Sequence, residues 1–185
     1  SYKGKSISKY YYYDLEKNGK TTRIICLDYN DDRFTFDSTG KVTAQPNWGE
    51  YHEGQLKWLA GTALQGDFDE CIVFSHATYV TSRGDALDRI LEAYQTKDRV
   101  KMPSLSVDFA NRTSGNILTY HHGHEHDHER TFDYKKRLWR IETPMTVTAI
   151  DLVSVGSEKT FVRTLDETKP LIYELLINGT QNEKV

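Results

Sequence analysis

The sequence predicts an α/β domain: a mixed sheet with two main helices, closed by antiparallel strands at its C-terminal end. Two observations carry this prediction. Short apolar runs typical of buried strands occur at residues 22–28, 71–74 and 117–120, and segments 53–64 and 85–94 show helical spacing between them. With 185 residues the chain has the size of one domain, so we expect residues 1–185 to fold as a single unit.

The N-terminal part is predicted to be a β-hairpin followed by a long loop. Residues 10–15 are rich in tyrosine, which favours a strand, and Asn18-Gly19 is a strong signal for a hairpin turn. Residues 22–28 are apolar enough for a strand buried on both faces. Residues 29–50 are polar and show little periodicity, so a long loop is expected there.

The middle of the chain is predicted to hold two helices around a buried strand. Their apolar stripes consist of Leu56, Leu59 and Ala60 in the first helix and of Leu87, Ile90 and Leu91 in the second. The strand at residues 71–74 ends in Ser75-His76. Residues 97–114 show no clear pattern and are expected to be irregular.

The last third of the chain is predicted to be made of strands. The strand at 117–120 leads directly into a run of histidines. Further strands are expected at residues 138–141, 147–155, 160–165 and 171–177, with a hairpin turn at 157–159. Short polar turns between successive strands favour antiparallel pairing.

Composition excludes several classes of protein. Lys and Arg number 24 against 27 Asp and Glu, so the net charge of −3 argues against a large nucleic-acid-binding surface. No apolar run approaches the roughly 18–20 residues that span a bilayer, and residues 1–9 lack the apolar core of a signal peptide. Cys26 and Cys71 lie in strand-like runs and are predicted to be free buried thiols, which favours a reducing, cytoplasmic location.

Five of the seven histidines lie within eight residues, and this cluster has three possible interpretations. They are a solvated polar loop, a metal-affinity tract of low specificity, and a defined metal site at the end of a strand. The buried strand that precedes the cluster favours the defined site. Gly123 is expected to turn the backbone sharply through a positive φ. The five histidines are His121, His122, His124, His126 and His128.

His76 also follows a buried strand, and the carboxyl ends of strands are where α/β sheets place their sites. We therefore expect the metal ligands to be His76, His124 and His126, because imidazole suits Zn, Mn and Fe. The other histidines of the cluster are predicted to be peripheral, and His52 is predicted to lie on the surface.

Nucleophilic and nucleotide chemistry find little support. Ser75 and His76 are neighbours on a strand and point to opposite faces, so they do not form a Ser–His pair. The chain contains no Gly-x-Ser-x-Gly elbow and no glycine-rich phosphate loop.

Phe74-Ser-His76, followed about fifty residues later by Gly123-His-Glu-His126, resembles the second half of calcineurin-like metallophosphoesterases. The helix that begins at Glu53 and the hairpin at residues 11–28 resemble the segments that precede these motifs, so the resemblance covers roughly residues 10–165.

The resemblance implies the C-terminal half of a four-layer sandwich with two divalent metal ions (Mn, Fe or Zn) and a phosphoester substrate. It assigns one metal to His126 and the other to His76 and His124.

The sequence departs from that family in its first half. The Asp-x-His motif, the Gly-Asp motif that supplies the bridging carboxylate, and the Asn-His motif that supplies a general acid are all absent. The resemblance therefore implies part of a larger phosphatase or phosphodiesterase, with no complete catalytic set and little activity alone. A missing N-terminal half or a dimer partner is expected to cover an apolar sheet face. The alternative is a non-catalytic metal-binding or assembly module on the same scaffold.

Overall fold

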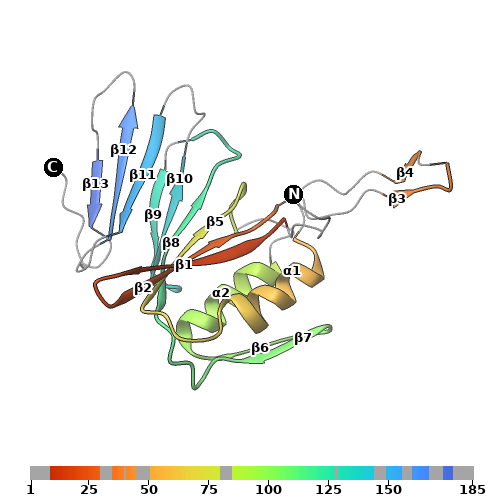
Figure 1. Cartoon of the computed structure of the whole chain (residues 1–185), viewed down its shortest axis with the longest axis horizontal. Coiled ribbons are helices and arrows are strands. Elements are labelled where there is room, and N and C mark those ends of the chain that lie inside the picture. Colours follow the sequence, from red (N-terminus) through yellow and green to blue (C-terminus); the bar gives the residue numbers. More distant parts are fainter. Residues whose placement is uncertain are drawn as a thin grey trace, which may run out of the picture.

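The computed structural model describes residues 9–29, 35–39, 41–44, 51–79, 85–127, 129–143, 149–155, 160–166 and 173–176. Its architecture is α/β, with a mixed sheet and two helical segments (Figure 1). This confirms the predicted fold class.

The main sheet has six strands in the order β1-β2-β5-β8-β10-β9. The four inner strands run parallel to one another, and an antiparallel strand closes each edge. All four inner strands therefore end at the same edge of the sheet. The strands are β1 (Tyr11–Lys17), β2 (Lys20–Cys26), β5 (Glu70–Phe74), β8 (Asn116–His122), β9 (Glu129–Asp133) and β10 (Leu138–Glu142).

The turn between β1 and β2 is the tight hairpin that the sequence predicted. Asn18 and Gly19 have φ angles of 53° and 76°, as a type I′ turn requires, and Lys17 pairs with Lys20. The prediction of this hairpin is confirmed.

The pairing of β5 with β8 contains a bulge. Cys71 lies opposite Ile117, but Ile72 lies opposite Thr119, so Leu118 is an extra residue on β8. As a result Ile117 and Tyr120, three residues apart, both join the same hydrophobic core.

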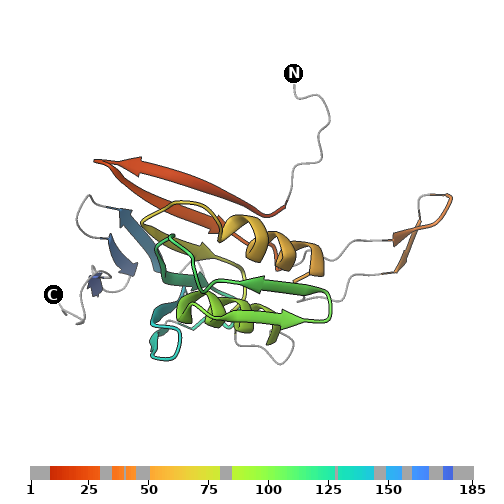
Figure 2. The same cartoon turned by 90° about the horizontal axis from the view of Figure 1, so that it is seen from below.

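Two helical segments pack on one face of this sheet (Figures 1 and 2). The first is α1 (Glu53–Trp58), which continues as a π-helical turn, η1 (Leu59–Ala63), and the second is α2 (Asp85–Thr96). Both predicted helices are confirmed. The stripe residues Leu59, Leu87, Ile90 and Leu91 are fully or almost fully buried in the core, which also contains Val73 of β5.

Lys136 joins the turn between β9 and β10 to α2. Its buried ammonium group lies 2.7 Å from Asp88 and 3.1 Å from Asp133, which also accepts a 2.9 Å hydrogen bond from the hydroxyl of Tyr79. Burial alone would raise the pKa of Asp133, but hydrogen bonds from the Lys136 backbone, Tyr79 and the Lys136 side chain outweigh it and lower this pKa.

Several strands lie where the sequence predicted irregular chain or no element. Residues 97–114 contain a hairpin of β6 (Arg99–Met102) and β7 (Leu105–Asp108), and the predicted loop 29–50 contains the short pair β3 (Thr35–Phe36) and β4 (Val42–Ala44). Strand β9 was also missed. These strands are two to five residues long, too short for a clear period-2 pattern.

The C-terminal strands are confirmed to within two residues at most ends. They are β11 (Ala149–Val155), β12 (Thr160–Asp166) and β13 (Tyr173–Leu176), which pair antiparallel as a separate three-stranded sheet. The predicted turn at 157–159 lies outside the described residues. The same holds for residues 147–148, 171–172 and 177 of the predicted strands. Among the helices that the structure describes, none is long and apolar enough to cross a membrane.

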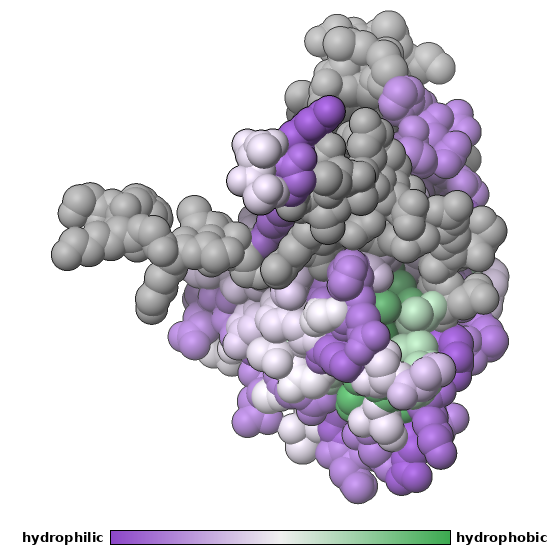
Figure 3. All heavy atoms as spheres, turned by 90° about the vertical axis from the view of Figure 1, so that its right-hand side faces the viewer, coloured by the Kyte–Doolittle hydropathy of each residue, from purple (hydrophilic) through white to green (hydrophobic). Residues whose placement is uncertain are grey.

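Cys26 and Cys71 were predicted to be free buried thiols. Both thiols are free as predicted, but only Cys71 is buried, and burial raises its pKa; Cys26 is half-buried. Ile72 and Ile141 are fully buried yet stand outside the core cluster that contains the helices. Figure 3 shows one side of the molecule, where hydrophilic side chains surround a small apolar area.

Candidate metal site

The predicted site lies where the parallel strands end. Backbone hydrogen bonds continue the ladder one step beyond the strands, from Ser75 N to His121 O (2.9 Å) and from Gly123 N to His76 O (3.0 Å). These bonds hold the His76 segment against the segment that begins at Gly123. The two histidine segments therefore lie side by side at the carboxyl edge of the parallel strands, as expected.

His76 and His124 form a close imidazole pair. His76 Nε2 lies 3.1 Å from His124 Nδ1, and their rings are nearly perpendicular, with centroids 5.1 Å apart. Partial burial lowers the pKa of His76, and the nearby imidazoles of His124 and His126 lower it further. His76 is therefore neutral at neutral pH, which is the protonation state that binds metals.

The two nitrogen atoms are at hydrogen-bond distance, a spacing that a shared cation would also give. Metal–nitrogen bonds to zinc are about 2.0–2.1 Å long, and two such bonds to nitrogen atoms 3.1 Å apart enclose roughly 95–100°. This angle lies between the octahedral and tetrahedral values. Both side chains are exposed, so a cation from solvent has access to them.

The turn that carries the histidines differs from the prediction. Gly123 does not have a positive φ; His124 and His126 do, with φ angles of 86° and 64°. A left-handed backbone is unfavourable for a residue with a Cβ, and such residues cluster at functional sites. A Cβ on Gly123 would make only ordinary contacts, 3.5 Å from Thr143 O and 3.8 Å from His76 O. The sharp turn is thus made by the histidines themselves.

The third predicted ligand is less clearly placed. His126 is exposed and lies near enough to His76 to lower its pKa. Across the part of the chain that the structure describes, no three His, Cys, Asp or Glu side chains form a group that could hold a metal ion. The metal site of three histidines therefore stays a prediction. Of its three members, His76 and His124 are in contact.

Three further histidines lie within the described residues. His121 and His122 belong to strand β8 rather than to a loop, and they are only 3% and 4% exposed. His121 stacks on Phe74, with ring centroids 4.7 Å apart. His52 is exposed at the start of α1, as predicted, whereas His128 lies outside the described residues.

Two tyrosines next to the pair were not predicted. The ring centroid of Tyr29 lies 6.0 Å from that of His76 and 5.7 Å from that of His124, and Tyr51 packs edge-on against Tyr29 at 5.5 Å. Gln55 of α1 makes two hydrogen bonds to the backbone of Asp28, which fixes the end of β2 just before Tyr29. The signal was present, because Tyr29 follows a buried parallel strand that ends at the same edge.

One carboxylate oxygen of Glu125 lies 3.9 Å from His124 Nε2, whereas the carboxylates of Glu129 and Glu142 are engaged elsewhere or buried. Glu129 accepts a hydrogen bond from the hydroxyl of Thr131 and lies 3.2 Å from Arg140. Glu142 pairs in register with His122, and both side chains are buried. Burial lowers the pKa of His122, whereas the Gly123 carbonyl and the Glu142 carboxylate favour its charged form.

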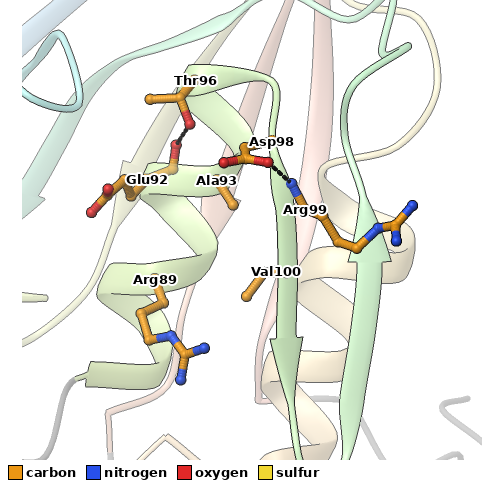
Figure 4. Close-up of a pocket in the computed structure, with 7 residues that line it drawn as sticks. All are labelled: Arg89, Glu92, Ala93, Thr96, Asp98, Arg99 and Val100. Atoms are coloured by element: carbon orange, nitrogen blue, oxygen red, sulfur yellow. Dashed lines mark hydrogen bonds between the residues drawn. The ribbon is translucent and has the colours of Figure 1, made fainter.

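A separate hollow of about 160 Å³ lies between α2 and β6 (Figure 4). Its lining includes Arg89, Glu92, Asp98 and Arg99. The guanidinium of Arg99 is paired with Asp108 at 2.6 Å, and that of Arg89 donates to the carbonyl of Lys101. Because no histidine lines it and its arginines are engaged, it adds nothing to the metal site.

No protein-family model matches this chain, and no curated protein matches it.

Proposed function

We propose that the chain belongs to a metal-dependent phosphoester hydrolase, a phosphatase or phosphodiesterase, and supplies the second-half ligands of a dinuclear centre. The observation that carries this proposal is the 3.1 Å contact between His76 and His124 at the carboxyl edge of parallel strands. The motif order supports it further, since Ser-His and Gly-His-x-His elements follow strands β5 and β8 as they do in calcineurin-like metallophosphoesterases. The fold would then be half of their four-layer sandwich.

In this proposal the residues of the chain act as neutral nitrogen donors. His76 and His124 hold one divalent ion and His126 holds the other. Mn, Fe or Zn ions, when bound, supply Lewis acidity and a metal-activated hydroxide for attack on phosphorus. The ring of Tyr29 flanks the pair on one side.

The bridging carboxylate and the general acid are proposed to come from an N-terminal half or a dimer partner, which would also cover the sheet. The cytoplasm is the proposed compartment, on the basis of the two free thiols.

A second function is favoured by one observation. Within the described residues only two imidazoles come together, without a third donor group. Such a pair suits a non-catalytic metal-binding or assembly module, in which the phosphoesterase scaffold is kept without its chemistry.

Metal binding tests what the two functions share. Equilibrium dialysis of the 185-residue chain against Zn²⁺ or Mn²⁺ is expected to show binding that His76→Ala and His124→Ala each weaken at least about tenfold. His52→Ala is the matched control, because His52 is an exposed histidine outside the site. Equal binding by all four proteins would refute the site.

Hydrolysis of a nitrophenyl phosphoester by the same chain separates a complete site from a partial one. Turnover near background is expected, because general acids typically contribute about 10²–10⁴-fold to the rate. Robust turnover that His126→Ala abolishes would show that the chain builds a complete site. Appearance of turnover only after an N-terminal half is added would favour the enzyme over the module.

A further inference from the structure

A network of three hydroxyl groups lies directly beside the backbone of His76. The hydroxyl of Tyr51 lies 2.6 Å from Ser75 Oγ and 3.0 Å from the hydroxyl of Tyr120. Both tyrosines also donate toward the carbonyl oxygen of Ala77, at 3.2 Å and 3.0 Å. Tyr51 thus joins the segment before α1 to the end of β5 and to β8.

The network holds the two residues on either side of His76. Ser75 is bound through its side chain, and Ala77 is bound through its carbonyl oxygen. The carbonyl of His76 itself accepts a hydrogen bond from Gly123 N. Three consecutive residues are therefore tied down, while the His76 side chain projects to the exposed edge where it meets His124.

The hydroxyl groups keep their protons at neutral pH. Burial raises the pKa of both Tyr51 and Tyr120, and Tyr120 is completely buried. The three hydroxyls supply three protons for the four contacts, so at most three of these contacts carry a proton at any one time. Tyr51 also supports Tyr29, the ring that flanks both histidines.

We propose that Tyr51 is a positioning residue for the metal site: through Ser75, Tyr120 and Ala77 it sets the place of His76 opposite His124. This inference rests on the proposed function, because it assumes that His76 is a ligand. A misplaced ligand binds weakly even when the fold is intact, since metal sites depend on the groups that orient their ligands.

The test compares two tyrosine hydroxyls of similar setting. The hydroxyl of Tyr94 is also paired with a serine hydroxyl (Ser114, 2.8 Å) and a carbonyl (Gly115, 2.6 Å), but it touches neither histidine segment. Tyr51→Phe and Tyr94→Phe therefore each remove one buried hydroxyl. Co²⁺ titration followed by visible absorption measures the affinity and also the ligand geometry, and thermal unfolding measures the stability.

Tyr51→Phe is expected to weaken Co²⁺ binding about 10–100-fold and to alter the absorption band, whereas Tyr94→Phe lowers stability and leaves both unchanged. Ser75→Ala removes one bond of the network and is expected to shift binding in the same direction by a smaller factor.

Wild-type binding with an unchanged Tyr51→Phe titration would overturn the positioning role alone. Equal losses in Tyr51→Phe and Tyr94→Phe would overturn it too, by showing a general effect on folding. Absence of Co²⁺ binding by the wild-type chain would instead overturn the proposed function, and the positioning role with it.

Discussion

The left-handed backbone at His124 predicts that this residue opposes stability. Its φ angle is 86°, a region that suits glycine and strains any residue with a Cβ. We compare His124→Gly with His124→Ala, because both remove the imidazole and only the first removes the Cβ. The glycine variant is expected to be the more stable of the two.

The size of the effect follows from two opposing terms. Relief of left-handed strain contributes about 1–2 kcal/mol in the folded state. Glycine loosens the unfolded chain relative to alanine by about 0.4–1 kcal/mol. The net difference is about 0.8 kcal/mol in favour of glycine, which in a chain of this size raises the melting temperature by about 2–3 °C.

Urea unfolding of both variants without metal measures this difference, and Glu125 provides the control. Glu125 lies between the two strained histidines without a positive φ, so Glu125→Gly is expected to be less stable than Glu125→Ala. A His124→Gly variant less stable than His124→Ala would show that His124 does not hold a left-handed backbone in solution.

Three further predictions concern stability and metal binding. Gly115→Ala should destabilise the fold by at least about 3 kcal/mol in denaturant unfolding, since its Cβ would lie 1.7 Å from the carbonyl oxygen of Asp69; near-wild-type stability would contradict this packing. Because the pKa of Asp133 is lowered in the folded state, this group stabilises the fold above its unfolded-state pKa of about 3.9, and that stability is lost as the pH falls through the folded-state pKa. Between about pH 5 and 2, Asp133→Asn should therefore lose less stability than wild type. Parallel curves of unfolding free energy against pH would refute this. His121→Ala should leave metal affinity within about twofold, because a metal uses only four to six ligand positions, whereas an effect as large as that of His126→Ala in equilibrium dialysis would reverse the assignment of roles.

Those elements whose signal is local were predictable from the sequence. Asn18-Gly19 specifies its own turn, and the apolar stripes of both helices specify their buried faces. The contact between His76 and His124 was predictable for a different reason. The carboxyl ends of parallel strands meet at one edge wherever the strands lie along the chain, so the topology brings together two histidine segments 48 residues apart.

Features that depend on distant partners were not predictable. His121 and His122 read as loop residues because histidines are polar, yet pairing with β5 and β10 extends β8 through both of them. The hydroxyl contact of Tyr51 with Tyr120 joins residues 69 positions apart, and no local pattern marks it. The positive φ was assigned to Gly123 on propensity, but tertiary pairing of Gly123 with His76 moved the turn one residue further.

The extra residue in β8 determines which histidine meets His76. With Leu118 counted, Phe74 lies opposite His121, and the ladder delivers Gly123 to His76. If the two strands paired without this bulge, Leu118 would lie opposite Ile72, and every later residue of β8 would slip by one position and exchange faces. His122 would then stand where Gly123 now stands, and the imidazole pair would lose its partner. The spacing of the site is therefore set by the bulge at Leu118, six residues before His124, where the side chain itself makes no contribution to the chemistry.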